Sequence, residues 1–310
     1  MKVVYMGTPD FAVKPLEALI ENNYEVVGVF TQPDKPVGRK AVLTPPPVKV
    51  VALQNNIPVF QPETLKNGAG VKILDELKPD IVIVVAYGKI LPKDFLDYAK
   101  YGCINIHGSI LPKYRGAAPI QWSVLDGEEY AGVTSMQMNE GLDTGDILLI
   151  EKTKIEPNET SGDLYERLTV LGAEVLLKTL EAVENNSLNP SQQDDSKSSY
   201  AKMLDKSLSK IDWNLSAQIV HNTIRGLDPW PVALTVFEGK NLKLFRSRIL
   251  DGEYNKPAGS VYQSKEGIYV VCGDKKAVLI TEVQLEGKKR MSSLDFSRGA
   301  KLTDGTIFES

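Results

Sequence analysis

The sequence has few of the side chains that build disulfide frameworks or metal sites. Only two cysteines, Cys103 and Cys272, and two histidines occur among its 310 residues. The cysteines belong to no C-x-x-C motif and to no Cys/His cluster, so neither a disulfide framework nor a structural zinc site is indicated. We therefore predict a protein that works without a metal ion, in a reducing compartment such as the cytoplasm.

Long apolar segments are lacking as well. The longest strongly apolar run covers residues 81–86, far short of the roughly 20 residues that cross a bilayer. At the N-terminus the apolar run ends at Gly7-Thr8-Pro9-Asp10, which is too early for the hydrophobic region of a signal peptide. These absences predict a soluble cytoplasmic protein with no membrane partner.

The charge is distributed unevenly along the chain. Residues 1–195 contain 18 Lys and Arg against 27 Asp and Glu, a net charge of −9. Residues 196–310 contain 18 against 13, a net charge of +5. A basic second half hints at an anionic partner, although an ordinary basic surface explains an excess of this size equally well.

The first half of the chain alternates strand and helix patterns. Continuous β-branched runs, such as residues 80–86, suit parallel strands covered on both faces. The alternation predicts an α/β fold with a doubly wound, mostly parallel sheet and a site at the carboxyl ends of its strands. We expect strands at 2–7, 25–31, 58–60, 80–86, 102–107, 132–139 and 146–155, and helices at 10–22, 48–54, 71–77 and 161–184.

The first strand–helix turn lacks the glycine motifs that bind nucleotide phosphates. It reads Gly7-Thr8-Pro9-Asp10-Phe11 and contains no G-x-G-x-x-G, and no G-x-x-x-x-G-K-[ST] occurs in the chain. The predicted sheet is therefore used for something other than NAD or a Walker-type nucleotide.

The pattern changes after residue 184. Residues 185–199 are rich in Asn, Ser, Gln and Asp, which is typical of a linker. A helix is expected at 217–226, followed by short strands at 232–237, 242–247, 259–261, 267–272 and 277–285. This spacing predicts a second, smaller β-barrel domain. Small barrels often bind oligonucleotides, although many do not.

The densest candidate chemistry is the sequence Asn105-Ile106-His107-Gly108. Side chains two residues apart on a strand point to the same side, so Asn105 and His107 should face one space. An imidazole can exchange a proton near neutral pH, and an amide NH2 can donate to a developing oxyanion. Acyl transfer to an amine needs this pair, but a lone histidine on a strand is more often structural.

Two further stretches could complete a site. Glycines flank Asp143 in the loop 141–146, where a carboxylate could orient the imidazole, although spacing alone favours a plain Asp/Gly turn. The segments at 87–92 and 109–119 mix apolar and small residues after predicted strands. They could form the walls of a pocket for a planar, apolar ligand.

Together these residues resemble the methionyl-tRNA formyltransferase family over nearly the whole chain. Asn105, His107 and the distant Asp143 are shared with the wider group of folate-dependent formyltransferases, so they indicate the reaction rather than the acceptor. The second half of the chain indicates which acceptor is used, because Ile211-Asp212-Trp213 and Pro229-Trp230-Pro231 resemble the C-terminal domain of the tRNA enzyme. The other matching segments are 7–12, 31–36, 86–92, 111–119, 224–226 and 287–291.

The resemblance implies transfer of the formyl group of 10-formyltetrahydrofolate to the α-amino group of methionyl initiator tRNA, for translation initiation. It implies a formyltransferase catalytic domain at 1–188, a linker at 189–206 and an OB-like, tRNA-binding β-barrel at 207–310. Asn105, His107 and Asp143 match the catalytic trio. The expected folate-binding residues are Ser109, Ile110, Leu111, Pro112, Tyr87, Gly88, Ile90 and Leu91.

The Pro-rich loop 33–49 matches a family insertion that contacts the tRNA acceptor end. Arg39 is the first candidate for such a contact, with Lys40 and Lys35 beside it. Without the resemblance, a Pro-stiffened surface loop would be the default interpretation. We expect the enzyme to act as a monomer.

Three other functions use similar residues. A formyltransferase acting on a purine precursor or an amino sugar would share the folate site, and a hydrolase could release formate to water. A non-catalytic RNA-binding protein could have kept the scaffold. The predicted barrel, its positive charge and the basic loop favour tRNA, and the intact trio of Asn105, His107 and Asp143 argues against a decayed enzyme.

Overall fold

The computed structural model describes residues 1–38 and 40–309. Its chain forms two compact units, each built from several stretches of sequence. Unit 1 comprises Met1–Gly116, Gly132–Thr153 and Tyr165–Tyr200. Unit 2 comprises Ala117–Ala131, Lys154–Leu164 and Ala201–Ser310, so it includes two stretches that precede the polar segment 185–199.

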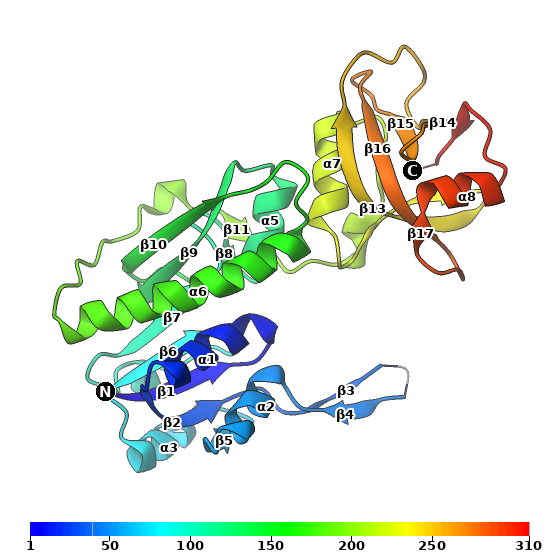
Figure 1. Ribbon diagram of the computed structural model, residues 1–310. Coiled ribbons are helices and arrows are strands. Elements are labelled where there is room, and N and C mark those ends of the chain that lie inside the picture. The colour runs from blue at the N-terminus through cyan, green and yellow to red at the C-terminus, as the bar shows by residue number, and fades with distance from the viewer. Residues whose placement is uncertain (39, 310) are drawn as a thin grey trace. The chain divides into compact units, whose positions relative to one another are not determined.

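Unit 1 is organised by a seven-stranded sheet in the order β10-β9-β7-β6-β1-β2-β5 (Figure 1). The strands from β5 to β7 pair in parallel, and β9 joins β7 in antiparallel fashion. This confirms the predicted doubly wound, mostly parallel sheet. The strands are β1 (Lys2–Gly7), β2 (Glu25–Phe30), β5 (Val59–Phe60), β6 (Ile81–Val85), β7 (Cys103–His107), β9 (Tyr130–Gln137) and β10 (Ile147–Lys154).

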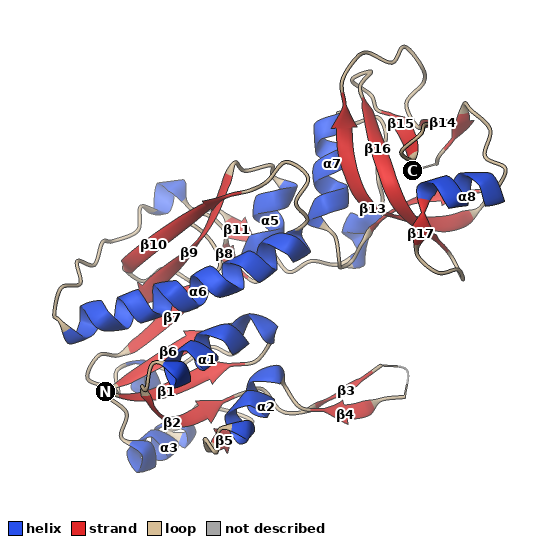
Figure 2. Cartoon of the chain, viewed as in Figure 1, coloured by secondary structure: helices blue, strands red, loops and turns tan. Residues whose placement is uncertain are grey.

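Helices cover both faces of this sheet (Figure 2). On one face α6 approaches so closely that a Cβ added at Gly172 would lie 3.6 Å from Ile106 Cγ2. On the other face Leu74 and Phe95 pack in one buried cluster with Cys103. The helices of this unit are η1 (Asp10–Ala12), α1 (Val13–Glu21), α2 (Pro47–Gln54), α3 (Ala69–Leu77), α4 (Lys93–Leu96) and α6 (Ser161–Glu184), whose first turn belongs to unit 2. Helix α5 (Pro119–Leu125) lies wholly within unit 2 and packs against its core.

Several short elements were not predicted. The Pro-rich loop contains a hairpin of β3 (Lys35–Val37) and β4 (Val42–Thr44), and α4 and α5 lie where no helix was predicted. The polar stretch carries η2 (Asp195–Lys197) and leads into β11 (Tyr200–Ala201), which pairs with β8 (Arg115–Gly116). Strands β3 and β4 are exposed and pair with each other, whereas β8 and β11 are distant in sequence. Neither arrangement produces a hydrophobic periodicity that would reveal it.

The main body of unit 2 is an antiparallel sheet that curls back on itself. Its order is β12-β13-β16-β15-β14-β18, with β17 beside β16. A bridge between Val236 and Glu309 joins the two ends of this path, which matches the predicted small barrel. The elements are η3 (Lys206–Ser209), α7 (Ala217–Gly226), β12 (Ala233–Phe237), β13 (Lys240–Leu250), β14 (Ser260–Gln263), β15 (Ile268–Val271), β16 (Ala277–Leu285), β17 (Met291–Ser292), α8 (Ser293–Gly299) and β18 (Thr306–Ile307).

Helix α7 belongs to the core of unit 2 but carries a polar face. Its apolar side chains, including Val220 and Ile224, join the barrel core. Its His221 is also buried: Nε2 lies 2.9 Å from Pro157 O and Nδ1 lies 2.8 Å from Ser247 Oγ. A carbonyl only accepts, so Nε2 carries the proton and Nδ1 can accept from the serine. Burial lowers the pKa of His221 below its ordinary value.

Within the described residues, no helix combines the length and the apolar composition needed to span a membrane.

The buried His221 makes stability depend on pH. The unfolded chain binds a proton at this residue near pH ~6.5, whereas the folded chain does so only at lower pH because the pKa is lowered. The free energy of unfolding should therefore fall as the pH drops below about 6.5, by at most about 1.4 kcal/mol per pH unit for one proton.

We expect His221→Gln to flatten this dependence between pH 7 and pH 5, measured as unfolding midpoints in urea. Wild-type protein provides the reference slope. An unchanged slope in the variant would show that His221 does not cause the pH dependence.

Candidate functional site

The candidate site lies where the strand order of unit 1 reverses. The chain moves from β1 to β2 and β5 on one side, and then to β6 and β7 on the other. Ligands in open α/β sheets bind outside the carboxyl ends of strands at such a reversal. The segments after β1 and β6 meet there, since the Thr8 hydroxyl donates to Tyr87 O over 3.1 Å.

Asn105 and His107 lie at the carboxyl end of β7. The strand is held on both sides, with Asn105 opposite Val84 of β6 and Met136 of β9. Asn105 is 8% exposed and His107 is 6% exposed, and their side chains leave the same face of the strand. Among the described residues no hydrogen bond to the Asn105 side-chain amide is found, so its NH2 group is available to a ligand.

The structure brings Asp143 next to this pair. Its Oδ2 lies 3.8 Å from His107 Nδ1, which is longer than a hydrogen bond but within range of direct charge interaction. The other ring nitrogen, Nε2, lies 2.9 Å from Tyr114 O and therefore carries the proton in this contact. Asp143 Oδ2 accepts from Gly116 N at 2.8 Å. The three residues predicted as catalytic thus meet at one place.

The loop that carries Asp143 depends on its glycines. Asn139 Oδ1 accepts from Gly141 N at 3.0 Å and from Thr144 Oγ1 at 2.8 Å, which closes the loop on itself. A Cβ at Gly145 would collide with Gln137 O, so the loop can lie against β9 only with glycine there. Asp143 itself has a φ of 53°, a left-handed conformation that aspartate tolerates.

The predicted folate-binding residues occupy two neighbouring segments, after β6 and after β7. Tyr87, Leu91, Ser109 and Leu111 are buried, whereas Ile90 is 84% exposed. Gly88 is exposed, and Ile110 and Pro112 are partly buried. The Ser109 hydroxyl donates to Lys113 O at 2.7 Å and so stabilises its own turn. The two segments share the same edge of the sheet because β6 and β7 are parallel neighbours.

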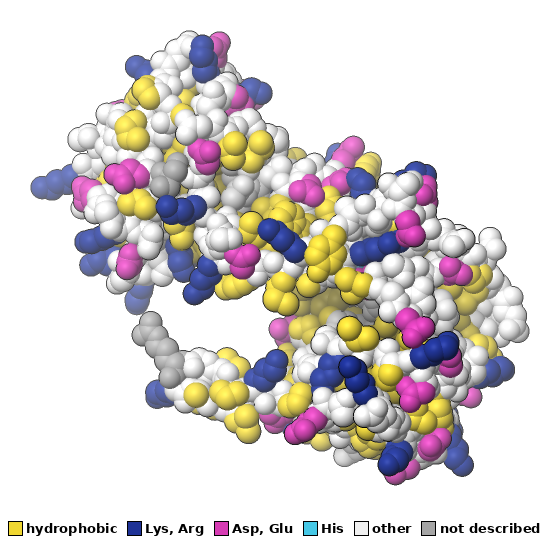
Figure 3. All heavy atoms as spheres, turned by 180° about the vertical axis from the view of Figure 1, so that it is seen from behind, with side chains coloured by type: hydrophobic (Ala, Val, Ile, Leu, Met, Phe, Trp, Pro, Cys, Tyr) yellow, Lys and Arg dark blue, Asp and Glu magenta, His cyan; other side chains and the backbone are white. Residues whose placement is uncertain are grey.

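The predicted tRNA-binding lysines belong to the β3–β4 hairpin, which projects from unit 1 with basic and apolar side chains on its surface (Figure 3). Lys35 lies on β3, and Lys35 and Lys40 are both exposed. Arg39 lies outside the described residues. Lys49, at the base of the loop, is instead paired with Asp34 at 2.8 Å. Hydrogen bonds from Lys49 and Gln61 lower the pKa of Asp34.

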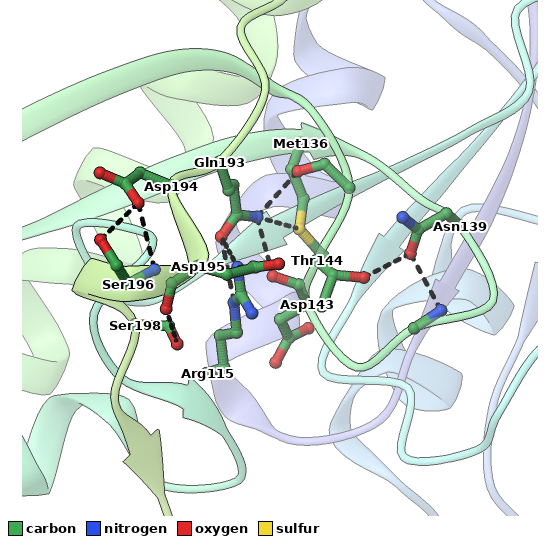
Figure 4. A network of polar contacts seen from close by, with 12 residues as sticks. Arg115, Met136, Asn139, Asp143, Thr144, Gln193, Asp194, Asp195, Ser196 and Ser198 are labelled. Atoms are coloured by element: carbon green, nitrogen blue, oxygen red, sulfur yellow. Dashed lines mark hydrogen bonds and ion pairs between the residues drawn. The ribbon is translucent and has the colours of Figure 1, made fainter.

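The sequence did not single out Arg115 or Gln193, which surround the Asp143 loop. Gln193 is buried although it belongs to the polar stretch 185–199 (Figure 4). Its amide contacts the backbone carbonyls of Asp143 and Gly145 and the guanidinium of Arg115. Composition alone gives no signal for a buried glutamine in a polar segment.

The described part of the chain shows neither a cluster of metal-binding side chains nor an exposed cysteine. Within residues 1–38 and 40–309, no three His, Cys, Asp or Glu side chains lie close enough to hold a metal ion. Burial raises the pKa of both Cys103 and Cys272 to about 12. A reactive thiolate is therefore not available from either cysteine at neutral pH.

Comparison with known proteins decides which family this site belongs to. The family model described as "Formyl transferase" matches residues 1–180, and the one described as "Formyl transferase, C-terminal domain" matches residues 203–301. The methionyl-tRNA formyltransferase of Lachnospira eligens is 49% identical over 313 residues, covering 99% of each chain. That of Bacillus subtilis is 46% identical, covering 99% of this chain and 97% of its own. This chain belongs to the methionyl-tRNA formyltransferase family.

Solved structures of other formyltransferases are also similar to this chain. The sugar 3N-formyltransferase WlaRD, solved in the presence of dTDP and 5-N-formyl-THF, has a TM-score of 0.70 at 23% identity, covering 93% of this chain and 99% of its own. An N-formyltransferase from Helicobacter canadensis, in complex with folinic acid and dTDP-3-aminofucose, has a TM-score of 0.71 at 23% identity, covering 90% and 98%. At this identity the likeness shows a shared fold.

The glycine at 145 supplies a test of the site's architecture. We expect Gly145→Ala to displace the Asp143 loop, because the added Cβ collides with Gln137 O. The variant should lose about 1–3 kcal/mol of stability, as overpacked positions do, together with most formyl transfer.

Gly299→Ala is the matched control, since a Cβ there meets no atom within 4 Å. Thermal unfolding and turnover are measured on both variants. A Gly145→Ala protein with wild-type stability and turnover would contradict the account of the loop.

Proposed function

We propose that this chain transfers the formyl group of 10-formyltetrahydrofolate to the free α-amino group of methionyl initiator tRNA, giving N-formylmethionyl-tRNA for translation initiation. The observation that carries this proposal is the meeting of Asn105, His107 and Asp143 at the carboxyl end of β7. Full-length relatives that are 46–49% identical support the choice of methionyl-tRNA as acceptor.

Asn105 is the oxyanion donor in the proposed reaction. As the amine nitrogen adds to the formyl carbon, the formyl oxygen gains negative charge. A pre-positioned amide NH2 stabilises this charge best when it has no competing partner. The Asn105 amide meets this condition, since none of the described residues hydrogen-bonds to it.

His107 handles the proton in the proposed reaction. The attacking amine must lose a proton and the departing folate nitrogen N10 must gain one, so one imidazole can serve both steps and the protons balance. Asp143 lies 3.8 Å from the ring and stabilises the positive charge that the ring carries between these steps. The hydrogen bond to Tyr114 O fixes the orientation of the ring.

The folate co-substrate supplies the formyl group, and the two segments at the edge of the sheet would hold it. Residues 87, 88, 90 and 91 after β6 and residues 109–112 after β7 form the proposed binding walls. An apolar side chain as exposed as Ile90, at 84%, fits a surface that a planar ligand covers.

The tRNA is assigned to the β3–β4 hairpin and to the second domain. We assign the catalytic domain to residues 1–188, the linker to 189–206 and the tRNA-binding barrel to 207–310. Lys35 and Lys40 are exposed and can reach phosphates, and Arg39 is proposed to act with them. The net charge of +5 over residues 196–310 supports the assignment of the barrel.

The enzyme is further proposed to act as a monomer in the cytoplasm. All three catalytic side chains come from one chain, so the site needs no second copy. Both cysteines are free and buried, which suits a reducing compartment. Light scattering of the purified protein tests the monomer.

A transfer assay with several acceptors tests the proposed function. The enzyme is incubated with 10-formyltetrahydrofolate labelled in the formyl group and offered methionyl-tRNA, glycinamide ribonucleotide, an amino sugar or water alone. We expect labelled product with methionyl-tRNA only. His107→Ala should lower turnover by roughly 10²- to 10⁴-fold while folate binding remains, and Asn105→Ala should lower it by about 10²-fold or more.

Other results of the same assay identify other functions. Transfer to the ribonucleotide or the amino sugar, or release of formate alone, would replace the proposed acceptor. Near wild-type turnover in His107→Ala would refute the proposed role of the histidine.

Binding of tRNA should depend strongly on salt. Each phosphate contact by a lysine or arginine adds about 0.7–0.9 to the slope of log affinity against log salt concentration. We expect the affinity for tRNA to fall at least about 10-fold between 50 and 200 mM salt. Lys35→Gln should make the slope shallower by about 0.7–0.9, the value of one phosphate contact.

Lys14→Gln is the matched control, because Lys14 lies on α1 and pairs with Glu17. A salt-independent affinity would contradict the proposed tRNA surface. An equal effect of both substitutions would contradict the role of the hairpin.

A further inference from the structure

Residues 114–116 hold both members of the His107–Asp143 pair. Tyr114 O accepts from His107 Nε2 at 2.9 Å, and Gly116 N donates to Asp143 Oδ2 at 2.8 Å. The backbone of this short segment therefore sets the distance between the imidazole and the carboxylate. The segment includes only the two-residue strand β8, which cannot hold itself in place.

Residues 193–199 hold this segment through hydrogen bonds to its backbone and to the Arg115 side chain. Tyr114 N donates to Ser199 Oγ, and Arg115 N donates to Ser199 O, both at 2.9 Å. The Arg115 side chain, 12% exposed, donates to Asp195 Oδ1 at 2.7 Å. Because Asp195 is 80% exposed, this ion pair contributes little. The stretch that composition identifies as a linker thus supports the site.

Gln193 is the central member of this support (Figure 4). Its Oε1 accepts from Arg115 Nε at 3.1 Å and from Arg115 Nη2 at 2.8 Å. Its Nε2 donates to Asp143 O and to Gly145 O, both at 2.8 Å. Both lone pairs and both N–H groups of the amide are therefore used. One buried amide ties the arginine beside Gly116 to the backbone of Asp143 itself.

From this geometry we infer that Gln193, acting with Arg115, is a positioning residue that sets the place of the Asp143 carboxylate relative to His107. The inference rests on the proposed catalytic role of Asp143. An apolar side chain at 193 would leave two loop carbonyls without their donor and would remove the acceptor that Arg115 shares with Gln193, so that the guanidinium keeps only its exposed contact with Asp195 among the contacts described above. The loop would then relax to recover hydrogen bonds. A shift of about 1 Å at a reacting group can cost on the order of 10²-fold in rate.

A double-mutant cycle between Gln193→Leu and Asp143→Asn tests the inference, with single-turnover rates as the measurement. We expect Gln193→Leu alone to lower the rate about 10- to 100-fold, with KM for folate and for methionyl-tRNA changed by no more than about 3-fold. In the Asp143→Asn background the same substitution should cost no more than about 2-fold, since residues acting through one another are not additive.

Gln192→Leu is the matched control. Gln192 is the same residue type one position earlier, and it is exposed. Its substitution should leave the rate unchanged, which separates an effect at Gln193 from a general effect of leucine in this stretch.

The outcomes separate this inference from the proposed function. If Asp143→Asn collapses the rate but Gln193→Leu does not, the role of Gln193 is refuted and the proposed function stands. If the two losses multiply, Gln193 does not act through Asp143, and the inference is again refuted. If Asp143→Asn keeps the wild-type rate, the proposed role of Asp143 fails, and the inference fails with it.

Arg115→Lys repeats the cycle with a milder change, in case Gln193→Leu does not fold. A lysine keeps the positive charge but loses the two-pronged contact with Gln193 Oε1. We expect about a 3- to 10-fold loss of rate, which disappears in the Asp143→Asn background. Circular dichroism melts confirm that each variant is folded. A wild-type rate in folded Arg115→Lys would show that the contact between Arg115 and Gln193 does not help to position Asp143.

Discussion

The close approach of His107 to Asp143 is the constraint that the segments around the candidate site satisfy. The two residues are 36 positions apart in the sequence, and their side chains approach to 3.8 Å. Neither has the other as a hydrogen-bond partner. Each is oriented by backbone of residues 114–116, through Tyr114 O and Gly116 N. The proposed chemistry therefore depends on a short segment that is itself held by distant parts of the chain.

The sheet supplies the rigid side of this arrangement. Strand β7 lies between β6 and β9, so the backbone of Asn105 is paired on both sides, and that of His107 is paired with Thr134 of β9. The loop that carries Asp143 follows β9 and can lie against that strand only with glycine at 145. The proposed proton transfer requires fixed distances, which a central strand and a glycine-bearing loop would provide where they meet.

Polar residues inside both units have a common role in holding segments that periodicity does not predict. Gln193 ties the Asp143 loop to Arg115 in unit 1. His221 ties α7 to Pro157 and Ser247 in unit 2. Each is buried with its hydrogen bonds made, and a buried polar group costs stability only when its partners are removed. Substitution of either residue should therefore destabilise the contact between the segments that it joins.

Much of the fold followed from the sequence alone. The Val- and Ile-rich run at 80–86 predicted a parallel strand covered on both faces, and the structure has β6 at Ile81–Val85, buried throughout. The short strands from residue 232 onward predicted a small β-barrel, and the structure has the curled antiparallel sheet of β12 to β18 there. Apolar periodicity is strong in such elements because burial selects residue type directly. The β3–β4 hairpin escaped prediction because its short strands are exposed and carry no burial pattern. Helix α5 escaped prediction because it packs against the core of unit 2, far along the chain.

For the site, the sequence by itself determined the candidates, and the tertiary structure decided how they meet. The spacing of Asn105 and His107 placed both side chains on one face of a strand, which is a local property of backbone geometry. Nothing local could place Asp143 beside His107, or bury Gln193 from a stretch with the composition of a linker. Those contacts join residues tens of positions apart, and only the packing of the whole unit brings them within reach.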